Sequence, residues 1–148
     1  MPMIEIWDGS SVELAELLDA VSSPEDLDWT ILEIWAVGQT DETDVVALER
    51  QAVESPHGLN LSAVALRELA DRLQQVIDGI VVGYRGPAPD RDAVDLRSTA
   101  EIVLEAIDST LWRVYARETG VIDRLRQRYF DVRDVEPEVA IPPMHEMS

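Results

Sequence analysis

Two stretches of the chain space their apolar residues as an amphipathic helix does. Over about residues 11–21, leucine and valine recur at intervals of three and four, and Ser10 with Glu13 forms a capping box at the start. Over about residues 62–77, a stripe of leucine, valine and isoleucine follows Ser62, which we expect to be the N-terminal cap. A third, shorter helix completes the set. The predicted helices are residues 11–21, 62–77 and 120–128.

Short apolar runs and period-two alternation predict strands between these helices. Residues 29–37 are apolar on both faces, with only Glu33 interrupting, which is typical of a strand inside a sheet. Residues 101–107 and 111–117 are predicted to form a hairpin joined through Asp108-Ser109-Thr110. The predicted strands are residues 3–7, 29–37, 45–53, 80–84, 101–107, 111–117 and 130–135.

One of these predictions rests on an ambiguous pattern. Residues 45–53 contain β-branched residues and a period-two set, which favour a strand, whereas the alanine, leucine, glutamate and arginine in the middle would allow a helix. We predict the strand. Clustered strands with a few helices indicate an α+β fold, with a mostly antiparallel sheet of about five to seven strands and two to three helices packed on it.

The length of the chain, 148 residues, fits one domain. We predict a single α+β domain over residues 1–135 and a flexible C-terminal tail over residues 136–148, which contain three prolines. Residues 86–98 are rich in proline, aspartate and arginine and are predicted to form a mobile loop.

Acidic residues are concentrated in the first third of the chain. Residues 1–54 hold 14 acids and one arginine, a net charge of −13, and residues 55–148 hold 16 acids and 11 arginines, a net charge of −5. A net charge of −18 repels nucleic acid and anionic membranes and favours a basic partner. All 12 basic residues are arginine, which excludes a phosphate-loop lysine and a lysine Schiff base.

Few residues in the chain are suited to catalysis or metal binding. There is no cysteine, which excludes disulfides and thiolate zinc sites. His57 lies in a predicted turn and His145 in the tail, and no nucleophile elbow accompanies them. Asp41, Glu42 and Asp44 resemble only the start of a calcium loop, because the glycine and glutamate that complete such a loop are missing. We expect no catalytic, cofactor-binding or metal-binding residues.

The chain also lacks the sequence features of a membrane protein. No segment approaches the roughly 18 consecutive apolar residues that span a bilayer. The N-terminus has neither the basic region nor the apolar region of a signal peptide. We expect a cytoplasmic protein with no membrane partner, and export by a route without a cleaved signal stays open.

The C-terminal part of the chain carries the opposite charge pattern. Six arginines crowd into residues 113–133, which hold three acids. With the aromatic residues nearby, such a segment could bind nucleic acid. We expect instead that these arginines face the acidic N-terminal half, or a twofold mate, so nucleic acid is an unlikely partner and a homodimer is left open. The six are Arg113, Arg117, Arg124, Arg126, Arg128 and Arg133.

The charge pattern favours a protein that binds and neutralises a basic protein, such as a toxin or a nuclease. Immunity proteins and inhibitors of nucleic-acid enzymes use this physics, in which an acidic face steers a cationic active site into contact and covers it. A tryptophan among acids would add a binding hot spot. The residues predicted to bind the partner are Glu25, Asp26, Asp28, Trp35, Asp41, Glu42 and Asp44.

Two other functions agree with the same composition. The chain could be a non-catalytic housekeeping or structural protein whose acidity reflects solubility or salt adaptation. It could also be a small enzyme that uses carboxylates, which a pocket with convergent acids of shifted pKa would indicate.

Overall fold

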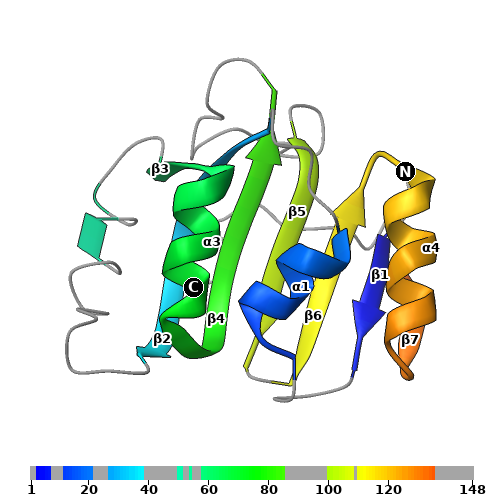
Figure 1. The fold of residues 1–148 in the computed structure, drawn as a ribbon. Coiled ribbons are helices and arrows are strands. Elements are labelled where there is room, and N and C mark those ends of the chain that lie inside the picture. The colour runs from blue at the N-terminus through cyan, green and yellow to red at the C-terminus, as the bar shows by residue number, and fades with distance from the viewer. Residues whose placement is uncertain are drawn as a thin grey trace.

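The computed structural model describes residues 3–7, 12–21, 27–38, 50–51, 54, 58–85, 100–108 and 110–135. These residues form one seven-stranded antiparallel sheet with the strand order β3-β2-β4-β5-β6-β1-β7, and three helices (Figure 1). The predicted α+β fold is confirmed. The strands are β1 (Met3–Ile6), β2 (Asp28–Gly38), β3 (Leu59–Ser62), β4 (Leu73–Tyr84), β5 (Ala100–Ile107), β6 (Leu111–Ala116) and β7 (Val132–Val135). The helices are α1 (Leu14–Val21), α3 (Ala63–Asp71) and α4 (Thr119–Arg128).

All three helices lie on the same face of the sheet, in front of it in Figure 1. Their apolar sides pack on alternate strand residues and form the main core, in which Leu17, Leu66 and Leu125 of the helices meet Trp29 and Val114 of the strands. We call this the helix-covered face. The opposite face, which we call the second face, has a smaller buried apolar cluster: Met3, Leu32, Ile80, Val82, Ala100, Val103 and Tyr115.

The predictions made from local pattern are confirmed in most places. β5 and β6 form the predicted hairpin, and Asp108 in its turn adopts a positive φ of 48°. Ser62 caps α3 as expected, because its hydroxyl accepts a hydrogen bond from the Ala65 N–H at 3.1 Å. The predicted helix over residues 120–128 is α4, which begins at Thr119 with Glu118 as its cap.

The second half of the predicted helix over residues 62–77 is wrong. α3 ends at Asp71, and the chain continues directly into β4 at Leu73. The first residues of β4 pair with the end of β2, with Leu73 opposite Gly38 and Val76 opposite Ala36. Leu73 and Val76 would be buried in either conformation, so their spacing alone does not distinguish helix from strand. The pairing of these residues with β2, which is distant in the sequence, makes them a strand.

The predicted strand over residues 45–53 is also wrong at the two residues of this range that the structure describes, because Arg50 and Gln51 are helical. The strand that follows β2 in the sequence is β3, and it pairs with the start of β2. It follows Gly58, whose φ of 71° and whose contact with β2 exclude a side chain: a Cβ there would lie 2.5 Å from the Ile31 carbonyl oxygen. With only four residues, β3 gives too short an alternation to recognise.

β2 is an internal strand along only part of its length. Asp28 to Ile31 pair with β3 on one side and with β4 on the other. From Glu33 to Gly38, β2 pairs with β4 alone among the described residues. The predicted mobile loop at residues 86–98 and the predicted tail at residues 136–148 lie outside the described residues.

Candidate functional site

Two of the seven predicted partner-binding residues lie in the described part of the chain. Asp28 is exposed at the start of β2, and Trp35, near the end of the same strand, has 56% of its surface exposed. Seven residues of strand separate them by roughly 23 Å, so they mark opposite ends of β2. The other five lie outside the described residues: Glu25, Asp26, Asp41, Glu42 and Asp44.

Trp35 is exposed because β2 contains a bulge. Strict alternation from Trp29 would place Trp35 on the helix-covered face beside it. The register shifts between Ile31 and Glu33, where one extra residue is inserted and the side chains change faces. Ile34 therefore joins Trp29 in the main core, and Trp35, opposite Asp78 of β4, lies on the second face.

The remaining tryptophans have structural roles. Trp29 is 1% exposed and Trp112 is 4% exposed, both in the core of the helix-covered face. The indole N–H of Trp112 donates a hydrogen bond to the Val12 carbonyl at 3.2 Å, which satisfies its one polar group. Trp7 is half-buried, with the guanidinium of Arg133 4.3 Å from its ring centroid. Trp35 is thus the one exposed tryptophan of the four.

Three carboxylates lie near Trp35 on the second face, and we call them the carboxylate cluster. Glu33 precedes Trp35 by two residues on the same side of β2, and Asp78 of β4 is directly opposite Trp35. Glu105 of β5 is paired with Ile80, the same residue that Glu33 faces from the other side. Glu33 and Asp78 are half-buried, and neither forms an ion pair within the described part of the chain.

Glu105 is the buried member of this cluster, with 1% of its side chain exposed. Its Oε1 accepts a long hydrogen bond of 3.3 Å from Nη1 of Arg113, and its Oε2 is buried without any hydrogen-bond partner among the described residues. Burial raises the pKa of Glu105, and the negative charges of Glu33 and Asp78 raise it further, while Arg113 opposes the shift.

Arg113 is bound more closely to another carboxylate than to Glu105. Its Nε and Nη2 donate to Oε2 of Glu5 at 3.2 and 3.0 Å. Glu5, Arg113 and Glu105 are in register across β1, β6 and β5, so the three charges form a straight row on the second face. Arg133 of β7 is opposite Glu5 on its other side, so the row continues with a second cation at the edge of the sheet.

All six arginines of residues 113–133 have partners within the chain. Arg113 and Arg128 reach acids of the first third, Glu5 and Glu16, as the sequence predicted. The other four bind locally or to backbone. Arg117 donates to the Ala100 carbonyl, Arg124 to the Val21 carbonyl, Arg126 to Asp134 and Arg133 to Asp131. The predicted charge balance is therefore confirmed for part of this segment.

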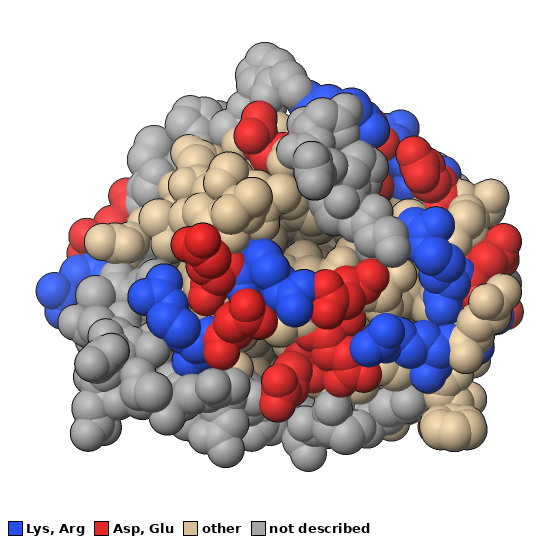
Figure 2. Space-filling view, in the orientation of Figure 1, with Lys and Arg blue, Asp and Glu red and all other residues tan. Residues whose placement is uncertain are grey.

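Opposite charges are interleaved over the helix-covered face, as Figure 2 shows. Arg67 of α3 pairs with both Asp19 of α1 and Asp71 of its own helix. Arg128 of α4 pairs with Glu16 of α1 at 3.6 Å. The acids of α1 are thus paired with arginines of the helices on either side of it, whereas Glu33 and Asp78 have no ion pair within the described part of the chain.

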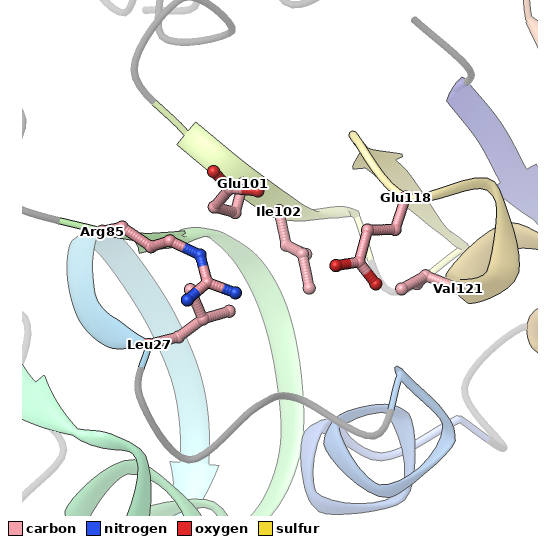
Figure 3. A pocket seen from close by; sticks show the side chains of 6 residues that line it. All are labelled: Leu27, Arg85, Glu101, Ile102, Glu118 and Val121. Carbon is pink, nitrogen blue, oxygen red and sulfur yellow. The ribbon is translucent and has the colours of Figure 1, made fainter.

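A shallow pocket, with room for little more than a water molecule, lies at one end of the sheet (Figure 3). Leu27, Ile102 and Val121 give it an apolar floor, and Arg85 and Glu118 extend over this floor from opposite sides. Glu101 completes the lining. The described lining offers charge recognition but no nucleophile beside a base, so it does not indicate a reaction.

No group of three or more histidine or acidic side chains in the described part of the chain is placed to hold a metal ion. None of the described helices is long and apolar enough to cross a membrane.

Comparisons of the chain with protein-family models, with curated proteins and with solved structures found no match. The site must therefore be interpreted from its own geometry.

Proposed function

We propose that this chain is an acidic binding protein that neutralises a basic protein, in the manner of an immunity protein or an inhibitor, in the cytoplasm. One observation carries the proposal: the exposed Trp35 lies beside Glu33 and Asp78, which have no cationic partner in the described part of the chain. Elsewhere on the described surface, Glu16 and Asp19 are already paired with arginines.

The net charge and the tryptophan would act on different steps of binding, the first on association and the second on dissociation. A net charge of −18 raises the association rate of a cationic protein at low ionic strength. A large indole ring that becomes buried in the interface slows dissociation, and tryptophan is enriched among the residues that dominate binding energy. The acids predicted from the sequence, Asp28 among them, would extend the negative field around this anchor.

The experiment that tests the proposal starts with capture of partners on the immobilised chain from a lysate of the source organism. A captured protein is purified, and its affinity is measured by calorimetry between about 50 and 300 mM salt. We expect a basic protein whose affinity falls steeply over this range, since charge steering is screened within a Debye length of roughly 10 Å at 0.1 M salt. A neutral partner, or an affinity that ignores salt, would overturn the proposal.

Trp35→Ala provides the matched test of the site. Removing a hot-spot tryptophan costs about 2 kcal/mol or more, which is roughly a thirtyfold loss of affinity. The control is Phe130→Ala, because Phe130 is a fully exposed aromatic residue after α4, far along the sheet from β2. Equal losses for the two variants would show that Trp35 is not the anchor. A chain that unfolds in low salt would point instead to salt adaptation.

A further inference from the structure

One edge of the sheet is formed by β7, which pairs with β1 alone within the described part of the chain. The side chains at this edge are accessible. Arg133 and Asp131 have 55% and 48% of their side-chain surface exposed, and Phe130, just before the strand, is fully exposed. The outer side of an edge strand presents backbone groups that another strand can bind. We infer that β7 pairs antiparallel with β7 of a second copy of the chain, across a twofold axis at Val132.

The hydrogen bonds between β1 and β7 show which backbone groups face the open edge. The Trp7 N–H donates to the Asp131 carbonyl at 2.7 Å, so these opposed residues form a hydrogen-bonded pair. Such pairs alternate along an antiparallel ladder with pairs that are not hydrogen-bonded. The next pair, Ile6 with Val132, is therefore not hydrogen-bonded, and Asp134 is in the same position two residues on. The N–H and C=O of Val132 and Asp134 thus point away from β1, toward a second strand.

The charges of β7 select the position of the twofold axis. An axis at Val132 places Asp131 opposite Arg133 of the second copy, and this pair occurs twice. An axis at Arg133 would place that arginine opposite itself, and an axis at Asp134 would bring two aspartates together. Opposite charges stabilise a cross-strand pair, and like charges destabilise it. The backbones of Asp131 and Arg133 bond to β1, so across the axis these residues form a non-hydrogen-bonded pair, in which side chains are closest.

The same contact would extend the charged row of the second face. This row runs Glu105, Arg113, Glu5 and Arg133, with alternating sign, and it ends in a cation at the edge of the sheet. Asp131 of the second copy would supply the next acid. Arg133 already binds Asp131 of its own chain at 3.1 Å, and a guanidinium has donors for two carboxylates, as Arg113 shows between Glu5 and Glu105.

Phe130 also fits this arrangement. It is two residues from the axis and opposite Asp134 of the second copy, so part of its exposed ring would be covered in the dimer. The net charge of −18 on each copy opposes association. The dimer is therefore sought at physiological salt, where long-range repulsion is screened.

The test measures the oligomeric state of the full chain by sedimentation velocity, from micromolar to millimolar concentration. We expect a reversible dimer. Asp131→Arg and Arg133→Asp should each weaken it by about tenfold or more, because each variant places like charges opposite one another twice. An equal mixture of the two variants should dimerise again, since every opposed pair then has opposite charges. A natural chain that stays monomeric throughout, or a mixture that does not associate, would overturn the inference.

Two further variants keep this test decisive. Glu68→Arg makes the same change of charge at an exposed position on α3, which packs on β2, β3 and β4, and we expect less than about a twofold effect. Val132→Pro removes an N–H that β1 does not use, so it should abolish the dimer and keep the β1–β7 ladder. Asp131→Arg and Val132→Pro carry the test if Arg133→Asp impairs folding. A dimer that survives both would overturn the inference.

Single cysteines locate the axis, because the chain has no cysteine of its own. Val132→Cys places two thiols opposite one another, with Cα atoms roughly 5.5 Å apart, a separation that a disulfide spans. On mild oxidation this variant should form a covalent dimer faster than Arg133→Cys or Asp134→Cys. Faster cross-linking at either of those positions would show another register and overturn the inference.

Four strands separate β7 from β2, which carries Trp35, so the dimer contact and the proposed binding site are tested separately. If a basic protein binds through Trp35 to a chain that is always monomeric, the dimer is wrong and the function stands. If the chain dimerises through β7 and no basic protein is captured, the dimer stands and the function is wrong.

Discussion

The two faces of the sheet use charge in different ways. On the helix-covered face the main core contains no charged side chain, and the charges lie outside it, on helices whose acids are paired with arginines such as Arg67 and Arg128. On the second face the charges lie in the sheet itself, between buried apolar residues, and Glu105 is almost fully buried. The acids of the helix-covered face are paired with arginines, whereas Glu33 and Asp78 on the second face have no ion pair within the described residues. The second face is therefore the better candidate for binding a cation.

The difference between the faces comes from the alternation of strand side chains. Neighbouring residues of β6 illustrate it, since Trp112 and Val114 enter the main core while Arg113 between them joins the charged row. The same strands therefore build the main core on one side and carry the proposed binding surface on the other. Substitutions in the main core should have the largest effect on stability, and substitutions of exposed residues on the second face should affect binding.

The largest contrast is expected between two tryptophans of β2. Trp29→Ala should lower the free energy of unfolding by about 3–5 kcal/mol, because it leaves a large cavity in the main core. Trp35→Ala should change it by less than about 0.5 kcal/mol, because the ring is largely exposed. Urea unfolding of both variants measures the contrast. Similar losses for the two would mean that the second face is also a packing surface around Trp35.

A smaller effect is expected at the centre of the charged row. Arg113→Met should cost about 2 kcal/mol of unfolding free energy at pH 7, because Glu5 and Glu105 lose their shared cation. Arg126→Met is the control, since its pair with Asp134 is exposed and should contribute less than about 1 kcal/mol. The two variants are compared by thermal and urea unfolding. An equal, small loss would show that the row does not stabilise the fold.

The smallest expected effect concerns Glu105 and the way in which the free energy of unfolding changes with pH. The pKa of Glu105 is raised above the ordinary 4.5 by burial, by Glu33 of β2 and by Asp78 of β4, against Arg113 of β6, which Glu5 of β1 also holds. Glu105 therefore stays protonated to a higher pH in the folded state than in the unfolded state. The contribution of Glu105 to stability therefore falls as pH rises from about 4.5 through the raised pKa, and is level above it.

Glu105→Gln removes this contribution, so the variant should gain stability relative to the natural chain as pH rises over the same window. The measurement is urea unfolding of both chains at steps between about pH 4 and pH 8, with the difference plotted against pH, because the remaining acids then cancel. A difference that is flat, or that falls with rising pH, would show that Glu105 ionises freely in the folded state.

Much of the fold could be predicted from the sequence where the signal is local. The β5–β6 hairpin, α1, α4 and the Ser62 cap each depend on residues within a few positions of one another, and each is confirmed, although α1 begins at Leu14 and not at residue 11 as the capping box predicted. Predictions failed where a distant partner decided the outcome. Leu73 fits a helix stripe equally well, but pairing with Gly38 of β2 makes it the start of β4.

The candidate site was only partly within reach of sequence reasoning. Trp35 is predicted from its residue type and its acidic neighbourhood, but the bulge in β2 that places it on the second face cannot be read from composition. Asp78 and Glu105 were not singled out, because each belongs to a different strand and nothing local marks it. The nearest signal was Glu33, a charged residue in an otherwise apolar strand, and the same irregularity recurs at Glu105 in β5.

By itself the sequence determined the net charge, its concentration in the first third, the absence of cysteine and lysine, and the alternation that makes an α+β fold, because these follow from composition and local spacing. Only the tertiary structure decided which charges are paired. Strand order and register bring Arg113 between Glu5 and Glu105 and place Ile80 between Glu105 and Glu33. Pairing across strands joins residues as far apart in the sequence as Met3 and Val135, and the energy of such contacts depends on distance in space, which the order of residues does not contain.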